Sequence, residues 1–188
     1  DAQAKFFNYS FVNRSKNNVK SLSIALGDLN KYSLEFLSDF LESDIYIVFG
    51  ASYIKGELIE FLLKKKTINI HMGVSPYYKG CDCNFWALYD NNPHLVGATI
   101  HLIERGLDNG PILYHAMSNI KNSPFEYTMS TVKSAFHSIA ERLKDNSIFD
   151  MKPVIQNKDN KIRYSTKIQF TEKIISDYLT KKIDLNSK

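Results

Sequence analysis

The stretch that decides the fold spans residues 67–80 and reads T-I-N-I-H-M-G-V-S-P-Y-Y-K-G. A short apolar run carries Asn69 and His71, and a loop with two glycines and a proline follows. Residues i and i+2 of a strand point to the same face, so an amide and an imidazole leave the strand end side by side. A buried strand has little structural use for two such groups. This strand end is therefore the first candidate for a functional site.

The segments before this stretch predict an α/β fold. Residues 45–50, I-Y-I-V-F-G, form a continuous apolar run of the kind found in strands that are covered on both faces. Residues 56–65 predict a helix that returns the chain to a strand at 68–71. Strand, helix and strand at this spacing form a βαβ unit, which places the two strands in parallel.

The rest of the chain continues the alternation of helices and strands. The sequence S-P-F-E at 123–126 combines an N-cap serine, a proline at the first helical position and a glutamate at the third, so a long helix begins there. No secondary structure is predicted for residues 5–20. We expect strands at 21–26, 96–103 and 112–115, short strand-like pieces at 153–156 and 162–164, and helices at 33–43, 84–90, 124–144 and 171–180.

Composition narrows the class of protein. The chain has 188 residues, of which 44% are hydrophobic, so it is globular and long enough to bury a core. The formal net charge of +4 tolerates an anionic substrate but does not indicate nucleic-acid binding. No apolar run approaches the roughly 20 residues of a membrane span, and no signal peptide is visible. The pattern C-D-C at 81–83 suits neither a disulfide nor a zinc site, so we expect a reduced, cytoplasmic protein.

A third polar group, Asp108, lies in the loop G-L-D-N-G-P. If this loop lies beside the one after His71, the pair is placed where α/β sheets bind ligands. A carboxylate that holds one nitrogen of a histidine sets its tautomer and stabilises its protonated form. The amide of Asn69 would add a hydrogen bond to a developing oxyanion. These three groups suit acyl transfer without a covalent enzyme intermediate.

Other interpretations of the polar residues fit the sequence less well. Ser75 resembles a nucleophile elbow, but Tyr77 occupies the position that the motif reserves for glycine. The segment 49–54 lacks the glycine pattern of a dinucleotide site. His101 lies in mid-strand and suits either a core histidine or a contact with substrate. The histidines have no metal-motif spacing, and this argues against a shared metal site made of His71, His94, His101 and His115.

Three motifs together carry a family resemblance. The segments I-N-I-H-M-G-V-S-P-Y-Y-K-G, G-A-T-I-H-L and G-L-D-N-G-P-I-L occur in this order, and the chain resembles the folate-dependent formyltransferases. That group includes methionyl-tRNA formyltransferase, glycinamide ribonucleotide transformylase and the sugar N-formyltransferases. The resemblance implies that Asn69, His71 and Asp108 are catalytic and that no metal is required. It also implies a Rossmann-like, mostly parallel sheet with helices on both faces.

The resemblance extends to the ligands. It implies 10-formyltetrahydrofolate as co-substrate, with the pterin held by Ser52, Tyr53 and Ile54 and by the backbone from Leu107 to Gly110. The form M-G-V-S-P, continuing into N-F-W-A-L-Y-D, resembles the sugar N-formyltransferases most. We therefore expect the acceptor to be a small-molecule amine, a nucleotide-linked amino sugar, rather than a nucleic acid. Formylation of methionyl-tRNA or of glycinamide ribonucleotide remains an alternative, as does hydrolysis of the folate donor.

The resemblance also suggests how the chain is organised. Residues 1–150 would form the catalytic domain, without the strand and helix with which the family usually begins, and residues 151–188 a C-terminal extension. The extension is too short for the separate C-terminal domain of the tRNA enzyme. The sequence leaves open whether the protein is a homodimer.

Overall fold

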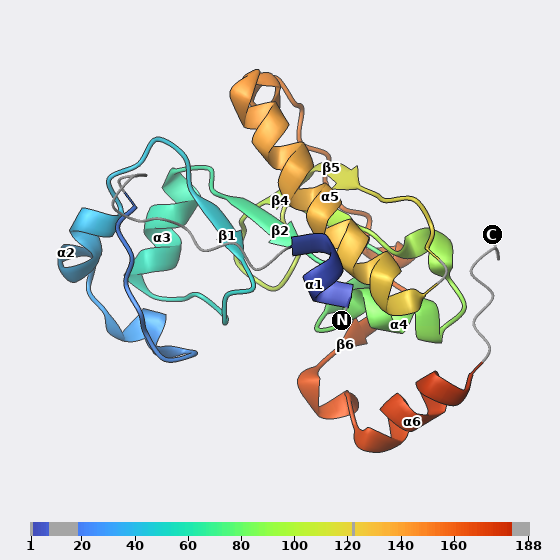
Figure 1. Cartoon of the computed structure of the whole chain (residues 1–188). Helices are drawn as coiled ribbons and strands as arrows, with labels where there is room; N and C mark the ends of the chain where they lie inside the picture. Colours follow the sequence, from blue (N-terminus) through green and yellow to red (C-terminus); the bar gives the residue numbers. More distant parts are fainter. Residues whose placement is uncertain (1, 8–18, 122, 182–188) are drawn as a thin grey trace.

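The computed structural model describes residues 2–7, 19–121 and 123–181, and is drawn in Figure 1. Much of the segment 5–20 lies outside the described residues, as do residues 182–188. The helices are α1 Ala2–Phe7, α2 Leu34–Leu37, α3 Glu57–Lys64, α4 Cys83–Tyr89, α5 Pro124–Lys144 and α6 Glu172–Thr180. The strands are β1 Ile47–Phe49, β2 Ile68–His71, β3 Tyr78–Gly80, β4 Ala98–Leu102, β5 Ile112–Ala116 and β6 Arg163–Ser165.

The central sheet has the order β1-β2-β4-β5. Its α/β character is as predicted, but only β1 and β2 run parallel, whereas β4 is antiparallel to both β2 and β5. The expected mostly parallel sheet is therefore corrected to a mixed one. A parallel connection needs a crossover of about a dozen or more residues. The segment 103–111 between β4 and β5 is too short for one, so the chain turns back on itself.

Helix α5 covers one face of this sheet. Its buried residues Ala135 and Ile139 pack in one cluster with four strand residues, Ile68, Ile70, Ala98 and Ile100. Strand side chains alternate between faces, so the polar residues between these apolar ones point away from α5. Those polar residues are Asn69 and His71 on β2 and Thr99 and His101 on β4. The alternation separates a core face from a polar face.

Two further apolar clusters flank the sheet. One joins α3 to α2 and to the segment before β1, with Leu58, Leu62, Leu37 and Tyr46 buried. Figure 1 shows this part beyond the β1 edge, on the left. The other cluster joins α4, α5 and α6, because Tyr178 of α6 is buried there and its ring centroid lies 4.5 Å from that of Phe85.

The C-terminal segment adds a second small sheet. Strand β6 pairs in parallel with β3, so residues 78–80 are a strand where the sequence suggested only a loop. Arg163 of β6 anchors the pair through two hydrogen bonds of 2.8 and 2.6 Å from its guanidinium to the carboxylate of Asp90. The strand expected at 153–156 is reduced to one bridge between Ile112 and Val154.

Most of the remaining predicted elements are confirmed within a few residues, but two near the start of the described chain are not. Residues 21–25 form no strand, and no described strand pairs with them; Leu26 after them is 77% exposed. The helix expected over 33–43 ends as the short α2, followed by a 3-10 turn at Ser38–Phe40. Residues 21–25 are mostly exposed, whereas Leu34, Leu37 and Leu41 pack in one apolar cluster although the α-helix there is short.

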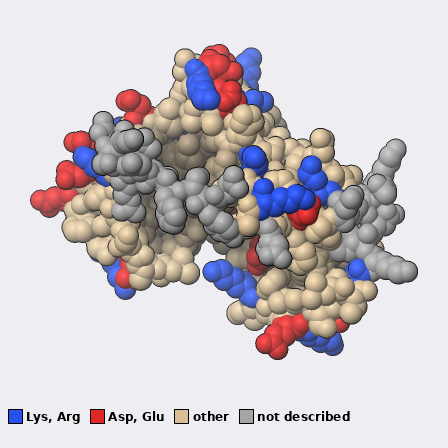
Figure 2. All heavy atoms as spheres, in the orientation of Figure 1, with Lys and Arg blue, Asp and Glu red and all other residues tan. Residues whose placement is uncertain are grey.

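Two features bear on partners. No helix in the described part of the chain has the length and apolar character needed to cross a bilayer. On the face shown in Figure 2, lysine and arginine are interspersed with acidic residues and form no continuous basic stripe.

Candidate active site

The centre of the site is the ring of His71 at the end of β2. Its Nδ1 lies 3.2 Å from Oδ1 of Asp108, and its Nε2 lies 3.0 Å from the backbone carbonyl oxygen of Tyr78. The side chains of His71 and Asp108 are only 6% and 12% exposed. Both ring nitrogens therefore face acceptors, and a neutral imidazole can donate to only one of them. The ring is oriented from both sides and shielded from water.

The carboxylate of Asp108 has a second partner besides His71. Its second carboxylate oxygen, Oδ2, accepts a hydrogen bond of 3.0 Å from the backbone N–H of Gly80. Its backbone φ of 50° lies in the left-handed region, which aspartate and asparagine tolerate better than most residues. The loop after His71 and the loop that carries Asp108 thus lie together, as the sequence analysis anticipated. The structure brings the two side chains into contact.

The third predicted catalytic residue, Asn69, is oriented by His101 on the neighbouring strand. The Nδ1 of His101 lies 2.8 Å from the carbonyl oxygen of Leu102, which can only accept, so Nδ1 carries the ring proton. Its Nε2 then accepts from the amide Nδ2 of Asn69 at 2.9 Å. Burial lowers the pKa of His101, which favours this neutral form. His101 is a buried, hydrogen-bonded histidine that aims the amide of Asn69.

Gln156 ties the C-terminal segment to the loop of Asp108. Its Nε2 donates to the backbone carbonyl of Asp108 at 2.9 Å and to that of Gly110 at 2.7 Å. The residue is only 6% exposed. Because both bonds go to the backbone on either side of the loop tip, Gln156 holds the loop in the shape that points Asp108 at His71.

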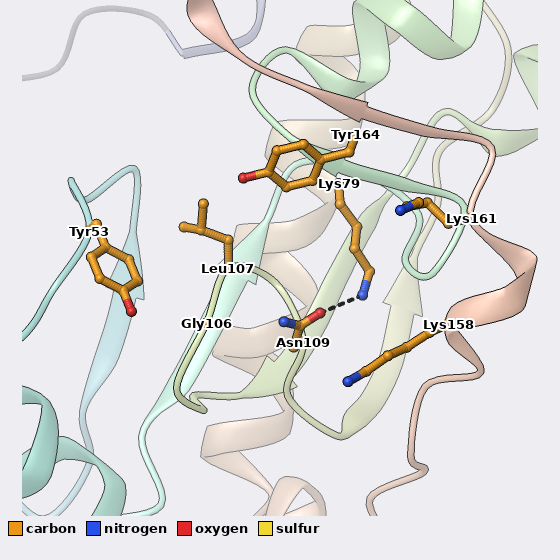
Figure 3. Close-up of a pocket in the computed structure, with 8 residues that line it drawn as sticks. All are labelled: Tyr53, Lys79, Gly106, Leu107, Asn109, Lys158, Lys161 and Tyr164. Atoms are coloured by element: carbon orange, nitrogen blue, oxygen red, sulfur yellow. Dashed lines mark hydrogen bonds between the residues drawn. The ribbon is translucent and has the colours of Figure 1, made fainter.

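A cavity of about 470 Å³ opens beside this loop (Figure 3). Two of the five residues predicted to hold the folate, Tyr53 and Leu107, line it. Ile54 is buried in the α2–α3 cluster instead, and Ser52 and Gly110 are not in the lining. The complete lining consists of Tyr53, Lys79, Gly106, Leu107, Asn109, Lys158, Lys161 and Tyr164.

Gly110 lies where the loop of Asp108 meets β4. A Cβ on this residue would lie 1.7 Å from the carbonyl oxygen of Leu102 and 2.9 Å from Nδ1 of His101. The loop therefore closes tightly against β4, and only glycine fits at that point. Gly110 contributes to the site by letting the loop approach the strand that carries His101.

A family model described as "Formyl transferase" matches residues 41–148, which include all of β2, β4, β5 and the loop of Asp108. The match covers more than half of the chain. The chain belongs to the formyl transferase family.

Two curated relatives illustrate the range of names in this family. A methionyl-tRNA formyltransferase of Trichodesmium erythraeum is 25% identical over an alignment of 138 positions, and the alignment covers 66% of this chain and 41% of that protein. A formyltetrahydrofolate deformylase 2, mitochondrial, of Arabidopsis thaliana is 32% identical over 101 residues, or 50% of this chain and 29% of that protein. The chain thus spans less than half the length of these relatives.

A solved structure of the formyltransferase PseJ from Anoxybacillus kamchatkensis has a similar fold. The TM-score is 0.53 with 23% sequence identity, over 80% of this chain and 72% of that one. That protein was crystallised in complex with a UDP-linked 4-formamido sugar and tetrahydrofolate. At this identity the likeness establishes the fold of the formyl transferase chain.

Sequence reasoning missed the contributions of Gln156, Gly80 and the Tyr78 carbonyl to this formyl transferase site. Backbone groups have no sequence signature, and Gln156 lies 48 residues beyond Asp108 in an irregular segment. The pairing of β3 with β6 brings the C-terminal segment to the site, but strands of three residues are too short to be predicted from sequence.

The residues considered for other chemistries have packing or hydrogen-bonding roles in the described part of the chain. In the described part of the chain, no group of three His, Cys, Asp or Glu side chains is arranged to hold a metal ion. Both cysteines are free, and burial raises the pKa of the Cys83 thiol, so this residue packs rather than reacts. Ser75 is fully buried in the loop after β2, where its backbone N–H donates to Thr99.

Proposed function

We propose that this formyl transferase chain transfers a formyl group from 10-formyltetrahydrofolate to a primary amine of a nucleotide-linked amino sugar. The observation that carries the proposal is the ring of His71, which is held between Asp108 and the Tyr78 carbonyl. Asn69 lies on the same strand face, and a cavity opens beside the loop of Asp108. We assign catalytic roles to Asn69, His71 and Asp108.

The chemistry follows from these three groups. The neutral amine attacks the formyl carbon, and a carbon–nitrogen bond forms while the carbonyl oxygen becomes negative. The second N–H of the Asn69 amide, whose first N–H binds His101, donates a hydrogen bond to that oxygen, and the His71 ring does so when its Nε2 turns from the Tyr78 carbonyl to the substrate. The attacking nitrogen then loses a proton and the leaving folate nitrogen gains one, with His71 and Asp108 mediating the exchange. The carbon–nitrogen bond to the folate breaks as the carbonyl reforms.

The residues beside Asp108 suit a folate. Tyr53 and Leu107 offer an aromatic and an apolar surface to a flat pterin ring, and the backbone of the 106–110 loop offers hydrogen-bonding groups. The cavity volume of about 470 Å³ falls within the range of small-molecule sites, roughly 300–1,000 Å³. When bound, 10-formyltetrahydrofolate supplies the activated formyl group, and this chain's residues orient it.

The acceptor is inferred from the loop after His71. Its form M-G-V-S-P resembles the sugar N-formyltransferases, and the UDP-sugar in the PseJ structure shows that this fold accommodates such an acceptor in a relative. On the face that Figure 2 shows, the basic side chains form no continuous stripe of the kind that a tRNA would contact. We therefore propose a small-molecule acceptor rather than a nucleic acid. Two free cysteines suit a reducing compartment, so we place the enzyme in the cytoplasm.

A second candidate is hydrolysis of the donor, and the likeness to the Arabidopsis deformylase favours it. The same three residues would then activate water, and formate would leave. A single assay separates the two activities. The chain is incubated with 10-formyltetrahydrofolate and a panel of UDP- and dTDP-linked amino sugars, while tetrahydrofolate, formate and formylated sugar are measured.

The expected result is tetrahydrofolate release that depends on one of the amino sugars and is matched by formylated product. Formate release at the same rate with and without acceptor would establish the hydrolase instead. If neither product forms at a rate that exceeds that of the His71→Ala variant, the proposed activity is wrong for this chain.

A further inference from the structure

Three lysines converge on the cavity beside Asp108. Lys79 of β3 is only 5% exposed, and its Nζ donates a 2.8 Å hydrogen bond to the side-chain oxygen of Asn109. Lys158 and Lys161 line the same cavity from the C-terminal segment. Figure 3 shows the side chains of Lys79 and Lys158 extending toward Asn109, with Lys161 on the same side of the cavity.

Such a cluster is electrostatically costly by itself. Among residues 2–7, 19–121 and 123–181, none of the ion pairs involves Lys79, Lys158 or Lys161. Burial lowers the pKa of Lys79, and the charges of Lys158 and Lys161 lower it further, whereas Asp108 acts in the opposite direction. Lys158 and Lys161 are exposed, so the cost of the like charges falls on the buried Lys79, and a negative group bound among the three lysines would offset it.

We propose that this cavity binds an oxyanion group of a substrate, held by Lys79, Lys158 and Lys161. This inference rests on the proposed function, because it places the negative group of one substrate next to the reacting groups. Asn109 directly follows Asp108 in the chain, and Lys79 directly precedes the glycine whose N–H binds the Asp108 carboxylate. An anion bound here would fix its substrate at the edge of the reaction centre.

Two substrates of the proposed reaction carry such a group. One is the diphosphate of a nucleotide-linked acceptor, and the other is the glutamyl carboxylate of the folate. Phosphates and carboxylates are both recognised by lysine ammonium groups through charge-assisted hydrogen bonds. Two tyrosines of the lining, Tyr53 and Tyr164, add flat surfaces for an attached ring.

Two of the three lysines lie in the C-terminal part of the chain. Lys158 and Lys161 lie beyond residue 148, where the match to the family model ends. They bracket a short 3-10 turn, Lys158–Asn160, whose N-cap Asn157 accepts from the backbone N–H of Asp159. Part of the substrate selectivity would thus reside in the C-terminal segment rather than in the shared part of the fold.

The test uses inorganic pyrophosphate as the probe and isothermal titration calorimetry as the measurement. Three proteins are compared, namely the unmodified chain, Lys158→Gln/Lys161→Gln, and the control Lys152→Gln/Lys167→Gln. The control removes the same charge from two exposed lysines outside the cavity lining. We expect pyrophosphate to bind the cavity double variant about tenfold more weakly, since each partly exposed ion pair contributes modestly, and to bind the control unchanged.

The source of the anion is resolved by three further titrations, with UDP, tetrahydrofolate and tetrahydropteroate, which lacks the glutamate. Selective weakening of UDP binding in the cavity variant identifies the acceptor diphosphate. Selective weakening of tetrahydrofolate binding, with tetrahydropteroate unaffected, identifies the glutamyl carboxylate. Either result supports the inference.

The inference is overturned if pyrophosphate does not bind the unmodified chain, or if the cavity variant and the control bind it equally. This failure is distinct from failure of the proposed function. Formyl transfer that depends on His71, together with unaltered anion binding in the variant, would leave the enzyme assignment in place and remove only the anion site.

Discussion

Two regions of the chain surround His71, and they contribute different kinds of group to the site. One is the strand region, which comprises β2, β3, β4 and the loop 106–110 and contributes Asn69, His101 and Asp108. The other is the C-terminal region, residues 154–165, which contributes Gln156 and strand β6. The first supplies the side chains to which we assign catalytic roles, and the second supplies hydrogen bonds that hold the first in place.

The contacts between the two regions are close. Ser165 of β6 lies so near Gly80 that a Cβ on the glycine would be 2.0 Å from the Ser165 carbonyl oxygen. The same glycine donates its N–H to Asp108. Contacts therefore cross the boundary expected at residue 150 directly at the site. Because the proposed catalytic residues and the residues that support them lie in different segments, substitutions can test the two groups independently.

The largest effect should follow removal of the reactive ring. We expect His71→Ala to lower turnover about 1,000-fold, because both proton exchange and a hydrogen bond to the oxyanion are lost. Steady-state kinetics in the amino-sugar assay measure this loss. His94→Ala serves as control, because His94 is exposed in the turn before β4 and has no part in the site. Near-normal turnover in His71→Ala would refute the role given to the ring.

A smaller loss is expected for the carboxylate partner. In Asp108→Asn the side chain keeps its shape, and asparagine tolerates the left-handed backbone at φ 50°. The fold should survive while the ring of His71 loses its charged partner, and turnover should fall about 100-fold. Thermal unfolding checks the fold, and Asp150→Asn, at an exposed site, controls for the change in net charge. An active Asp108→Asn enzyme would mean that the carboxylate only supports the loop.

The C-terminal region is tested by Gln156. Gln156→Leu removes both donors to the loop carbonyls, so we expect turnover to fall about tenfold, since each lost bond leaves a buried acceptor unpaired. The change should appear chiefly in kcat, because a loop without these two hydrogen bonds no longer holds Asp108 against His71. Gln169→Leu is the matched control, since Gln169 lies in the same segment but only caps a surface turn.

The near-isosteric Gln156→Glu separates positioning from packing. An ionised carboxylate can only accept, whereas its protonated form restores one donor to the loop. Turnover relative to the unmodified chain should therefore rise as the pH falls. A ratio that stays constant across pH would show that Gln156 acts only by filling space.

The smallest effect concerns the pH dependence of stability through His101. Its folded pKa is lowered from 6.5 by burial, so below about that pH the unfolded chain binds a proton that the folded chain does not. Stability that is present above pH 6.5 is thus lost as the pH falls toward the folded pKa. In His101→Gln this loss should be absent, and the free energies of unfolding of the two proteins should converge on acidification. Urea titrations at several pH values measure the difference, and parallel curves would contradict the prediction.

Sequence alone determined the features that depend on local spacing. Alternation along β2 placed Asn69 and His71 on one face, and the N-terminal signal of α5 set the start of that helix at Pro124. The order of the motifs pointed to the family, and the nearness of the Asp108 loop followed from an α/β sheet. These inferences succeed because each relies on residues only a few positions apart or on the usual position of ligand-binding loops in α/β sheets.

Only the tertiary structure decided which distant groups complete the site. The mixed pairing of the sheet, the β3–β6 strand pair, the two bonds from Gln156 and the convergence of Lys79 with Lys158 and Lys161 all join segments far apart in the chain. No local pattern encodes such contacts, because they depend on how the chain closes on itself and on backbone groups that every residue possesses.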